Sequence, residues 1–106
     1  LSENQTTRKA IHAAIQSGMP TYAECGGLMY LSENIVDFSG DTFPMVGAIP
    51  TTTAMRSRLT LGYRRGTVLE ESPIVARNTI VHGHEFHRST TTPAPDRPLF
   101  QFAETN

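Results

Sequence analysis

The residue in this sequence best suited to covalent chemistry is Cys25, its only cysteine. It follows a short β-prone run, Thr21–Glu24, and precedes Gly26, Gly27 and a second apolar run. A cysteine between the end of a strand and the start of a helix fits a nucleophile elbow, where a sharp turn holds the side chain out of the sheet. Glycines let the backbone fold closely around such a turn. We therefore predict that Cys25 is a catalytic thiol and that Gly26 and Gly27 form its elbow.

The helix expected after Cys25 would support a reactive thiol in two ways. Its unpaired N-terminal amides and the positive end of its dipole favour the thiolate over the thiol. The same amides, chiefly that of Gly26, could stabilise the negative oxygen that forms when a thiolate attacks a carbonyl. The alternative is that Cys25 is a small, unreactive core residue, because a lone cysteine in an intracellular protein is usually of that kind.

A second group of chemically capable side chains lies in the segment His82–His87. Histidines at positions 82, 84 and 87 suggest zinc, because neutral imidazoles are good zinc ligands. The pattern is similar to the His-x-His-x-Asp-His motif of metallo-β-lactamases, but Phe86 replaces the aspartate, and we predict no metal site. From spacing alone, His84 or His87 together with Glu85 could serve as the base and the orienting group for a cysteine nucleophile.

Composition and charge exclude several classes of protein. The 106 residues are 38% hydrophobic and fit one globular domain with a modest core. A net charge of −1 leaves no basic stripe for nucleic acid and no cationic helix for a membrane surface. One cysteine excludes an internal disulfide framework, and no apolar stretch is long enough to span a bilayer. We expect a cytoplasmic protein that binds neither nucleic acid nor membrane.

The first third of the chain predicts alternating helices and strands. We expect a helix over Leu1–Ser17 with a capping box at Ser2–Gln5, then a strand over Met19–Glu24, then a helix over Gly27–Glu33. This alternation predicts an α/β fold, a mostly parallel sheet covered by helices on both faces. Cys25 would then lie at the carboxyl end of a strand, where such sheets bind ligands. Side chains expected in the core here are Tyr22, Met29 and Leu31.

The rest of the chain predicts short strands that add an antiparallel part to the sheet. Asp37–Pro44 indicates a turn-rich connection, and Met45–Pro50 a short strand stopped by proline. Arg56–Tyr63 has a β pattern that two glycines should break into short strands or a hairpin around Arg64–Arg65. Those glycines are Gly62 and Gly66. The remaining elements are a strand over Asn78–Val81, an irregular loop over Thr90–Pro98 and a strand over Leu99–Phe102.

Four arginines form a local basic cluster on an otherwise balanced chain. One interpretation is a solvated face near Glu70 and Glu71. The other is contact with carboxylates of an acidic substrate or with a synthetase partner. The four are Arg56, Arg58, Arg64 and Arg65.

Two segments resemble those of a known enzyme family. Ala23–Leu31, with the sequence AECGGLMYL, is similar to the nucleophile segment of the glutamine amidotransferase domain in cobyrinate a,c-diamide synthases. Gly83–Ser89, with the sequence GHEFHRS, is similar to a second segment of that family, in the same order and at a similar separation. Arg88 departs from the family, whose members commonly carry an aromatic residue there. The resemblance spans nearly the whole chain and implies that residues 1–106 are part of a flavodoxin-like class I amidotransferase domain.

The resemblance also implies a reaction. Enzymes of this family hydrolyse glutamine through a cysteine thioester, which would form here on Cys25. The ammonia then amidates the a and c carboxylates of cobyrinate or hydrogenobyrinate in cobalamin biosynthesis. ATP and Mg²⁺ belong to an N-terminal synthetase domain that binds the corrin, so we expect no cofactor in residues 1–106 and expect the synthetase domain to be absent from them.

In the resembling enzymes the triad histidine lies in a later Tyr-x-His-like segment. The resemblance therefore implies that His84, Glu85 and His87 are structural and substrate-side residues. A Gly-rich loop of similar domains supplies a second oxyanion amide. We expect residues 1–106 to have negligible glutaminase activity alone, because neither of these two features is found in them.

Other functions remain open at this point. Cobyric acid synthases resemble the chain more weakly, because their two corresponding segments have different amino-acid sequences. A non-catalytic scaffold would leave Cys25 unreactive, and a histidine metal-binding domain would bind zinc through His84 and His87. A homodimer also remains open.

Overall fold

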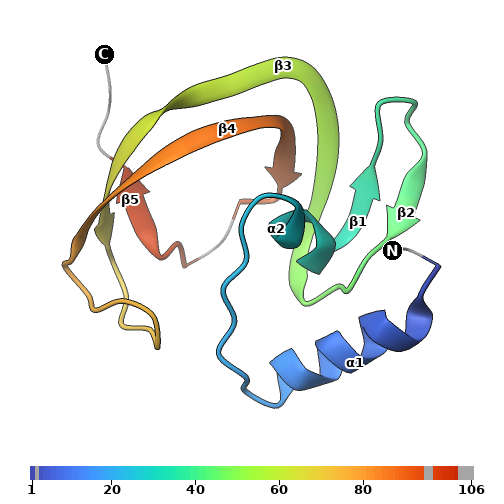
Figure 1. Ribbon diagram of the computed structural model, residues 1–106, viewed down its shortest axis with the longest axis horizontal. Helices are drawn as coiled ribbons and strands as arrows, with labels where there is room; N and C mark the ends of the chain where they lie inside the picture. The colour runs from blue at the N-terminus through green and yellow to red at the C-terminus, as the bar shows by residue number, and fades with distance from the viewer. Residues whose placement is uncertain (2, 95–96, 103–106) are drawn as a thin grey trace. The chain divides into compact units, whose positions relative to one another are not determined.

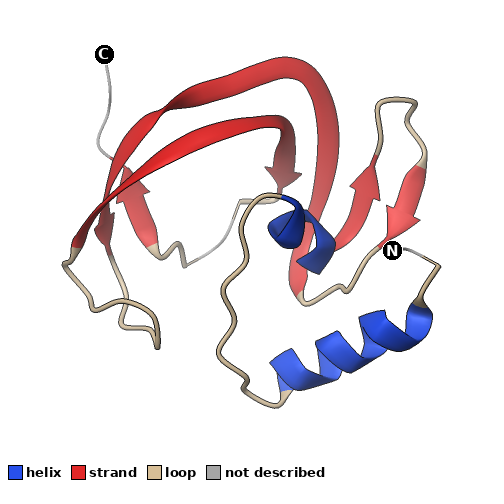
Figure 2. Cartoon of the chain, viewed as in Figure 1, coloured by secondary structure: helices blue, strands red, loops and turns tan. Residues whose placement is uncertain are grey.

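The computed structural model describes residues 1, 3–94 and 97–102. These residues form two helices and five strands, in the order α1, α2, β1, β2, β3, β4, β5; their arrangement can be followed in Figures 1 and 2. The helices are α1 (Gln5–Gln16) and α2 (Gly26–Leu31), and the strands are β1 (Ser32–Val36), β2 (Thr42–Pro44), β3 (Ile49–Val68), β4 (Ile80–Thr92) and β5 (Phe100–Phe102). The fold is α/β with a mixed sheet, as predicted.

The chain divides into two compact units. Unit 1 contains Leu1–Arg58 and Arg88–Ala94, and unit 2 contains Leu59–His87 and Pro95–Asn106. Strands β3 and β4 each continue from one unit into the other. Each unit is described separately below.

Helix α1 of unit 1 confirms the predicted first helix. Asn4 is its N-cap, and the Asn4 side chain accepts a hydrogen bond from the amide of Thr7 at 3.0 Å. The predicted capping box is wrong, because the helix begins at Gln5, one residue after this cap; Ser2 itself lies outside the described residues. Gly18 has φ +99°, a conformation that glycine adopts readily just beyond a helix end.

The predicted strand over Met19–Glu24 is wrong. These residues form an irregular segment between α1 and Cys25. The amide of Met19 bonds back to the Ala14 carbonyl, and among the described residues the next five positions donate no backbone hydrogen bond. A β-prone run becomes a strand only when a neighbouring strand pairs with it. Tyr22, predicted in the core, is 66% exposed.

Strands β1 and β2 follow α2 with almost no connection. The helix ends at Leu31, two residues earlier than expected, and Ser32 begins β1 directly. Strand β1 pairs in parallel with the start of β3 and antiparallel with β2. The turn between β1 and β2 was predicted, and there Asp37 accepts bonds from the amides of Ser39 and Asp41, each at 2.9 Å. The strand at Thr42–Pro44, within the predicted connection, was missed.

The segment after β2 forms part of the core of unit 1 without being a strand. Met45 and Val46 are buried with Leu31, and their amides donate to carbonyls of Glu33 and Tyr30 at 2.9 Å. The predicted strand Met45–Pro50 is therefore wrong over its first four residues. Strand β3 begins at Ile49 and runs through the proline, which a strand tolerates near its first residue.

In unit 2 a long strand replaces the predicted hairpin. Strand β3 continues without a break past Arg64 and Arg65 to Val68. Its neighbour β4 has its arrowhead at the opposite end in Figure 1. Strand β4 contains all of His82–His87, which lie beyond the predicted strand Asn78–Val81, and it extends to Thr92, three residues into the predicted loop.

The predicted strand near the C-terminus is confirmed as β5. It pairs antiparallel with the end of β3, with Phe102 opposite Gly66. Gly66 is buried, and a Cβ atom added there would lie 3.2 Å from the ring of Phe102. The glycine therefore lets an aromatic ring lie directly on the strand, and does not interrupt it.

In the described part of the chain, no helix is both long and apolar enough to span a membrane.

Candidate functional site

Cys25 has the backbone geometry of a strained turn. It is the N-cap of α2 with φ +56° and ψ −125°, and its side chain is exposed. A positive φ is uncommon for a residue with a side chain, and such conformations cost about 1–3 kcal/mol each. Strain of this kind at an exposed thiol before a helix is the local geometry of a nucleophile elbow. The expected elbow is therefore present in its turn and helix, although no strand leads into it.

The two glycines after Cys25 do not carry the positive φ themselves. A Cβ atom added to Gly26 would meet nothing within 4 Å, and one added to Gly27 would lie 3.9 Å from the Cβ of Ala23. The amide of Gly27 donates to the Glu24 carbonyl at 3.1 Å, whereas that of Gly26 has no acceptor among the described residues. Gly26 thus offers open space and a free N–H beside the thiol, and its role as an oxyanion donor stays a prediction.

Two exposed side chains just before Cys25 bond to each other. The hydroxyl of Tyr22 donates to Oε2 of Glu24 at 2.8 Å. This hydrogen bond, together with repulsion between a phenolate and the carboxylate, raises the pKa of Tyr22. Glu24 thus has a partner within its own segment.

The segment predicted to lie on the substrate side divides between the two faces of β4. Successive strand residues point to opposite faces, so that His82, His84 and Phe86 share one face and Glu85 and His87 share the other. The rings of His84 and Phe86 lie 6.4 Å apart, centroid to centroid, which agrees with this arrangement. The three predicted residues His84, Glu85 and His87 therefore do not form one cluster.

Glu85 is the centre of an ion-pair network in unit 2. Its Oε1 lies 2.9 Å from a guanidinium nitrogen of Arg64, and its Oε2 lies 2.8 Å from Nε2 of His87. The hydrogen bond from His87 is the largest cause of a lowered pKa at Glu85; burial opposes it, and the hydrogen bond and charge of Arg64 lower the pKa further. Glu85 is therefore held as a carboxylate by two partners of its own unit.

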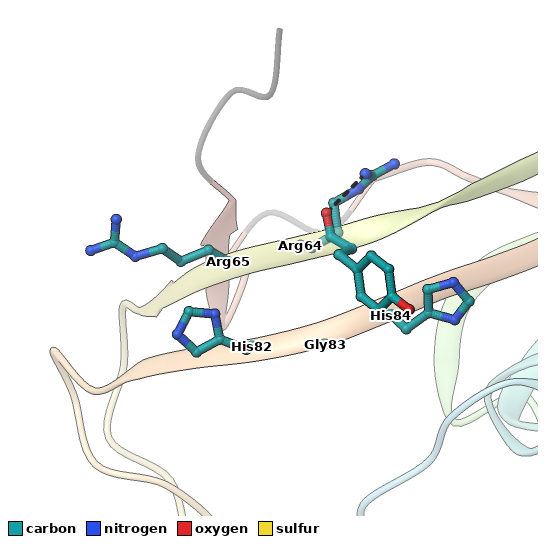
Figure 3. A pocket seen from close by; sticks show the side chains of 6 residues that line it. Arg64, Arg65, His82, Gly83 and His84 are labelled. Carbon is teal, nitrogen blue, oxygen red and sulfur yellow. Dashed lines mark hydrogen bonds between the residues drawn. The ribbon is translucent and has the colours of Figure 1, made fainter.

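The opposite face of the same two strands forms an open pocket of about 520 Å³. We call it the histidine pocket. The ring of Tyr63 lies 4.9 Å from that of His84, and Figure 3 shows the guanidinium of Arg64 directed away from both histidines. The lining residues are Tyr63, Arg64, Arg65, His82, Gly83 and His84.

The alternating positions of β4 also bear on the metal hypothesis. His87 is turned to the face opposite His82 and His84, and its Nε2 is bonded to Glu85. Within residues 1, 3–94 and 97–102, no group of three or more His, Cys, Asp or Glu side chains is arranged to hold a metal ion.

The four arginines of the predicted basic cluster are divided between the two units. Arg56 and Arg58 belong to unit 1, where Nε of Arg56 bonds to the hydroxyl of Thr90 at 3.4 Å. Arg64 and Arg65 belong to unit 2, and Arg64 is paired with Glu85. The two predicted acidic neighbours have other partners, because Glu70 pairs with Arg97 and Glu71 accepts from the amide of Arg77.

Comparison with known proteins decides the family. Residues 1–106 match the CobB/CobQ-like glutamine amidotransferase domain over their whole length. The chain belongs to this family. Cys25 lies at the strained turn of unit 1 in this amidotransferase domain, and its catalytic role stays a prediction.

Three curated relatives of this amidotransferase domain share one name. A protein of Synechococcus named cobyrinate a,c-diamide synthase is 52% identical over 101 residues, which is 95% of this chain and 22% of that protein. Proteins of the same name from Synechocystis and Saccharolobus solfataricus are 42% and 38% identical, over 95% and 84% of this chain and 21% and 20% of their own lengths. The amidotransferase domain thus spans about a fifth of the relatives it matches.

Sequence reasoning did not single out Tyr63 and Gly83, which the structure adds to the site residues of this amidotransferase domain. The sequence signal for this pocket was a pair of alternate positions on each strand, which face the same side of the sheet. These are Tyr63 and Arg65 on β3 and His82 and His84 on β4. This signal identifies a pocket only if β3 is known to pair with β4. The sequence instead predicted a turn at Arg64–Arg65, which would have separated Tyr63 from Arg65.

Proposed function

We propose that this domain hydrolyses glutamine at Cys25 and supplies the ammonia that amidates the a and c carboxylates of cobyrinate or hydrogenobyrinate in cobalamin biosynthesis. The strained, exposed conformation of Cys25 is the observation that carries the first half of the proposal. The shared name of the relatives supports the second half. Family membership supports glutamine as the substrate.

The chemistry proposed at Cys25 is acyl transfer. The thiolate attacks the side-chain amide carbon of glutamine, and a carbon–sulfur bond forms as the carbonyl becomes an oxyanion. The amide nitrogen takes up the proton that the thiol gave to the general base and leaves as ammonia when the intermediate collapses, and water then hydrolyses the remaining thioester to glutamate and the free thiol. The free N–H of Gly26 is the proposed oxyanion donor, and loss of such a donor lowers kcat by about 10²- to 10³-fold. Gly27 completes the turn.

The histidine segment takes a supporting part in this proposal. His87 is bonded to Glu85 and His84 contacts Tyr63, so we do not assign the general base to either. They remain structural and substrate-side residues, as does Glu85. The general base would be a histidine in a segment other than His82–His87.

ATP and Mg²⁺ would activate the acceptor carboxylate in a synthetase domain, which would also bind the corrin. No step of that half is derived from the described residues, and no cofactor is assigned to them. ATP dependence and the lone cysteine both fit a cytoplasmic enzyme. Cobyric acid synthesis is less well supported, because the relatives described above are all named for the a,c-diamide.

The test is covalent labelling of the protein as the cell makes it. Intact-mass spectrometry follows treatment with a glutamine-mimicking electrophile, with and without glutamine. We expect one adduct, mapped to Cys25, slowed by glutamine and absent in Cys25→Ser. A folded protein that gains no adduct, or gains it elsewhere, would contradict the proposal.

A further inference from the structure

The histidine pocket presents cationic and aromatic groups to solvent, and no acidic residue lines it. Its lining contains two arginines, two histidines, a tyrosine and a glycine, and no Asp or Glu. Arg64 is already neutralised by Glu85 on the other face. Arg65 is exposed, and its side chain makes no hydrogen bond or ion pair among the described residues, so that its positive charge is available to a ligand.

The geometry of the two strands brings this free charge next to an imidazole. The contact between Tyr63 and His84 fixes which side chains share a face. On strands that run in opposite directions, the residue two positions after Tyr63 and the residue two positions before His84 lie on that same face. These residues are Arg65 and His82, and Figure 3 shows both on the same side of His84 along the strands.

The pocket therefore has a polar end and an aromatic end. At the polar end, the guanidinium of Arg65 and the His82 ring provide N–H donors with the geometry that carboxylates accept. At the other end, Tyr63 is 82% exposed and its ring, with that of His84, offers an apolar surface. Between them, a Cβ atom added to Gly83 would meet nothing within 4 Å, which leaves the floor of the pocket open.

We propose that the histidine pocket binds an organic polycarboxylate, with Arg65 and His82 holding a carboxylate and Tyr63 and His84 contacting the face of the ring that bears it. This site lies in unit 2 and would bind a ligand, whereas the proposed hydrolysis of glutamine takes place at Cys25 in unit 1. A corrin with carboxylate side chains belongs to this ligand class; that one link rests on the proposed function.

The experiment uses a surrogate with the proposed chemistry. The protein as the cell makes it is titrated with benzene-1,3,5-tricarboxylate in a calorimeter. Three further probes separate charge from ring contact: the uncharged benzene-1,3,5-tricarboxamide, the acyclic propane-1,2,3-tricarboxylate and inorganic phosphate. We expect the aromatic tricarboxylate to bind most tightly and the triamide to show no binding.

Variants locate the site. Arg65→Ala should weaken binding about tenfold or more, because a hydrogen bond to a charged group is lost. Arg65→Lys should retain part of the affinity. Arg58→Ala is the matched control, an exposed arginine of the same strand outside the pocket, and should bind as the unaltered protein does. The ring signals of His82 and His84 in NMR spectra should shift on binding while those of His12 stay in place.

Failure of binding, or equal binding by Arg65→Ala and the unaltered protein, would overturn the proposal. Phosphate or the acyclic tricarboxylate binding as tightly as the aromatic one would overturn the ring contact. Labelling at Cys25 is read separately, so that loss of the polycarboxylate site and loss of the glutaminase proposal give different results.

Discussion

The carboxylate of Glu85 accepts a hydrogen bond from the ring of His87 at 2.8 Å, two residues further along β4. Both side chains lie on the face of β4 opposite His84, and about a third of each is exposed. In the sequence, His84, Glu85 and His87 suggest one catalytic cluster. In a strand, alternate residues face opposite sides, so the segment is divided into two groups.

The first prediction concerns the pH dependence of stability at Glu85. Its pKa is lowered below the ordinary 4.5, mainly by the hydrogen bond from His87. The ionised carboxylate therefore stabilises the fold above about pH 4.5, and this contribution is lost as the pH falls through the folded pKa. The contribution should be about 1 kcal/mol or less, since the pair is partly exposed.

Urea unfolding between pH 7 and pH 3 should show a weaker acid destabilisation in Glu85→Gln than in the unaltered protein. Glu33→Gln, at an exposed carboxylate without a side-chain partner in the described part, should unfold like the unaltered protein.

The second prediction concerns the strain at Cys25. Because glycine adopts a positive φ without penalty, Cys25→Gly should raise the free energy of unfolding by about 1 kcal/mol and abolish labelling by the glutamine-mimicking electrophile. Cys25→Ala also removes the thiol but keeps the strained backbone, so its stability should stay within about 0.5 kcal/mol of the unaltered protein. Chemical unfolding of the two variants side by side is the measurement. Equal stability of the glycine and alanine variants would show that the turn stores no strain.

The third prediction concerns two buried hydroxyls in unit 1. Ser32 and Thr53 are both fully buried, their oxygens lie 3.4 Å apart, and Ser32 also donates to the Met29 carbonyl at 2.5 Å. Ser32→Ala should cost about 1–3 kcal/mol, because it leaves the buried Thr53 hydroxyl without its acceptor and removes one of two hydrogen bonds to that carbonyl, which keeps the bond from the backbone amide of residue 32. Thr53→Val should cost less, about 1 kcal/mol, since it removes one hydroxyl and leaves the Ser32–Met29 bond intact. Urea unfolding of both single variants and the double variant tests this, and a valine variant as unstable as the alanine variant would count against it.

The fourth prediction concerns the N-cap of α1. Asn4→Ala should destabilise the helix by about 1 kcal/mol, because the amide of Thr7 loses its side-chain acceptor. The change should appear as faster hydrogen exchange of the α1 amides. Gln5→Ala, one position later and without a side-chain bond in the described structure, should leave exchange unchanged or slower because alanine favours helix. Equal exchange in Asn4→Ala and the unaltered protein would argue against a capping role.

Elements that depend on local pattern were predictable, and those that depend on pairing were not. The helical spacing of Ile11, Ala14 and Ile15 predicted α1, and alternation predicted β5. The length of β3 was missed, because Gly66 reads as a break and is in fact covered by Phe102. A contact across 36 positions leaves no trace in the local sequence.

The candidate site divides in the same way. The glycine pair and the helix after Cys25 are visible in sequence, and the positive φ of Cys25 is the conformation that such a turn requires. The partners of Glu85 and the lining of the histidine pocket follow from the register of β3 against β4. Since side chains alternate, a register shift by one residue would exchange the two sets, and local sequence does not determine it.

The continuity of β3 and β4 bears on how the protein could be dissected. The unit boundaries at Arg58–Leu59 and His87–Arg88 fall inside these paired strands, where a protease finds no unpaired loop to cut. Limited proteolysis should therefore not release either unit intact. Transfer of one unit to another protein would cut β3 and β4 within their hydrogen-bonded region. We therefore expect the two units to be inherited together, and an engineered version would have to keep both.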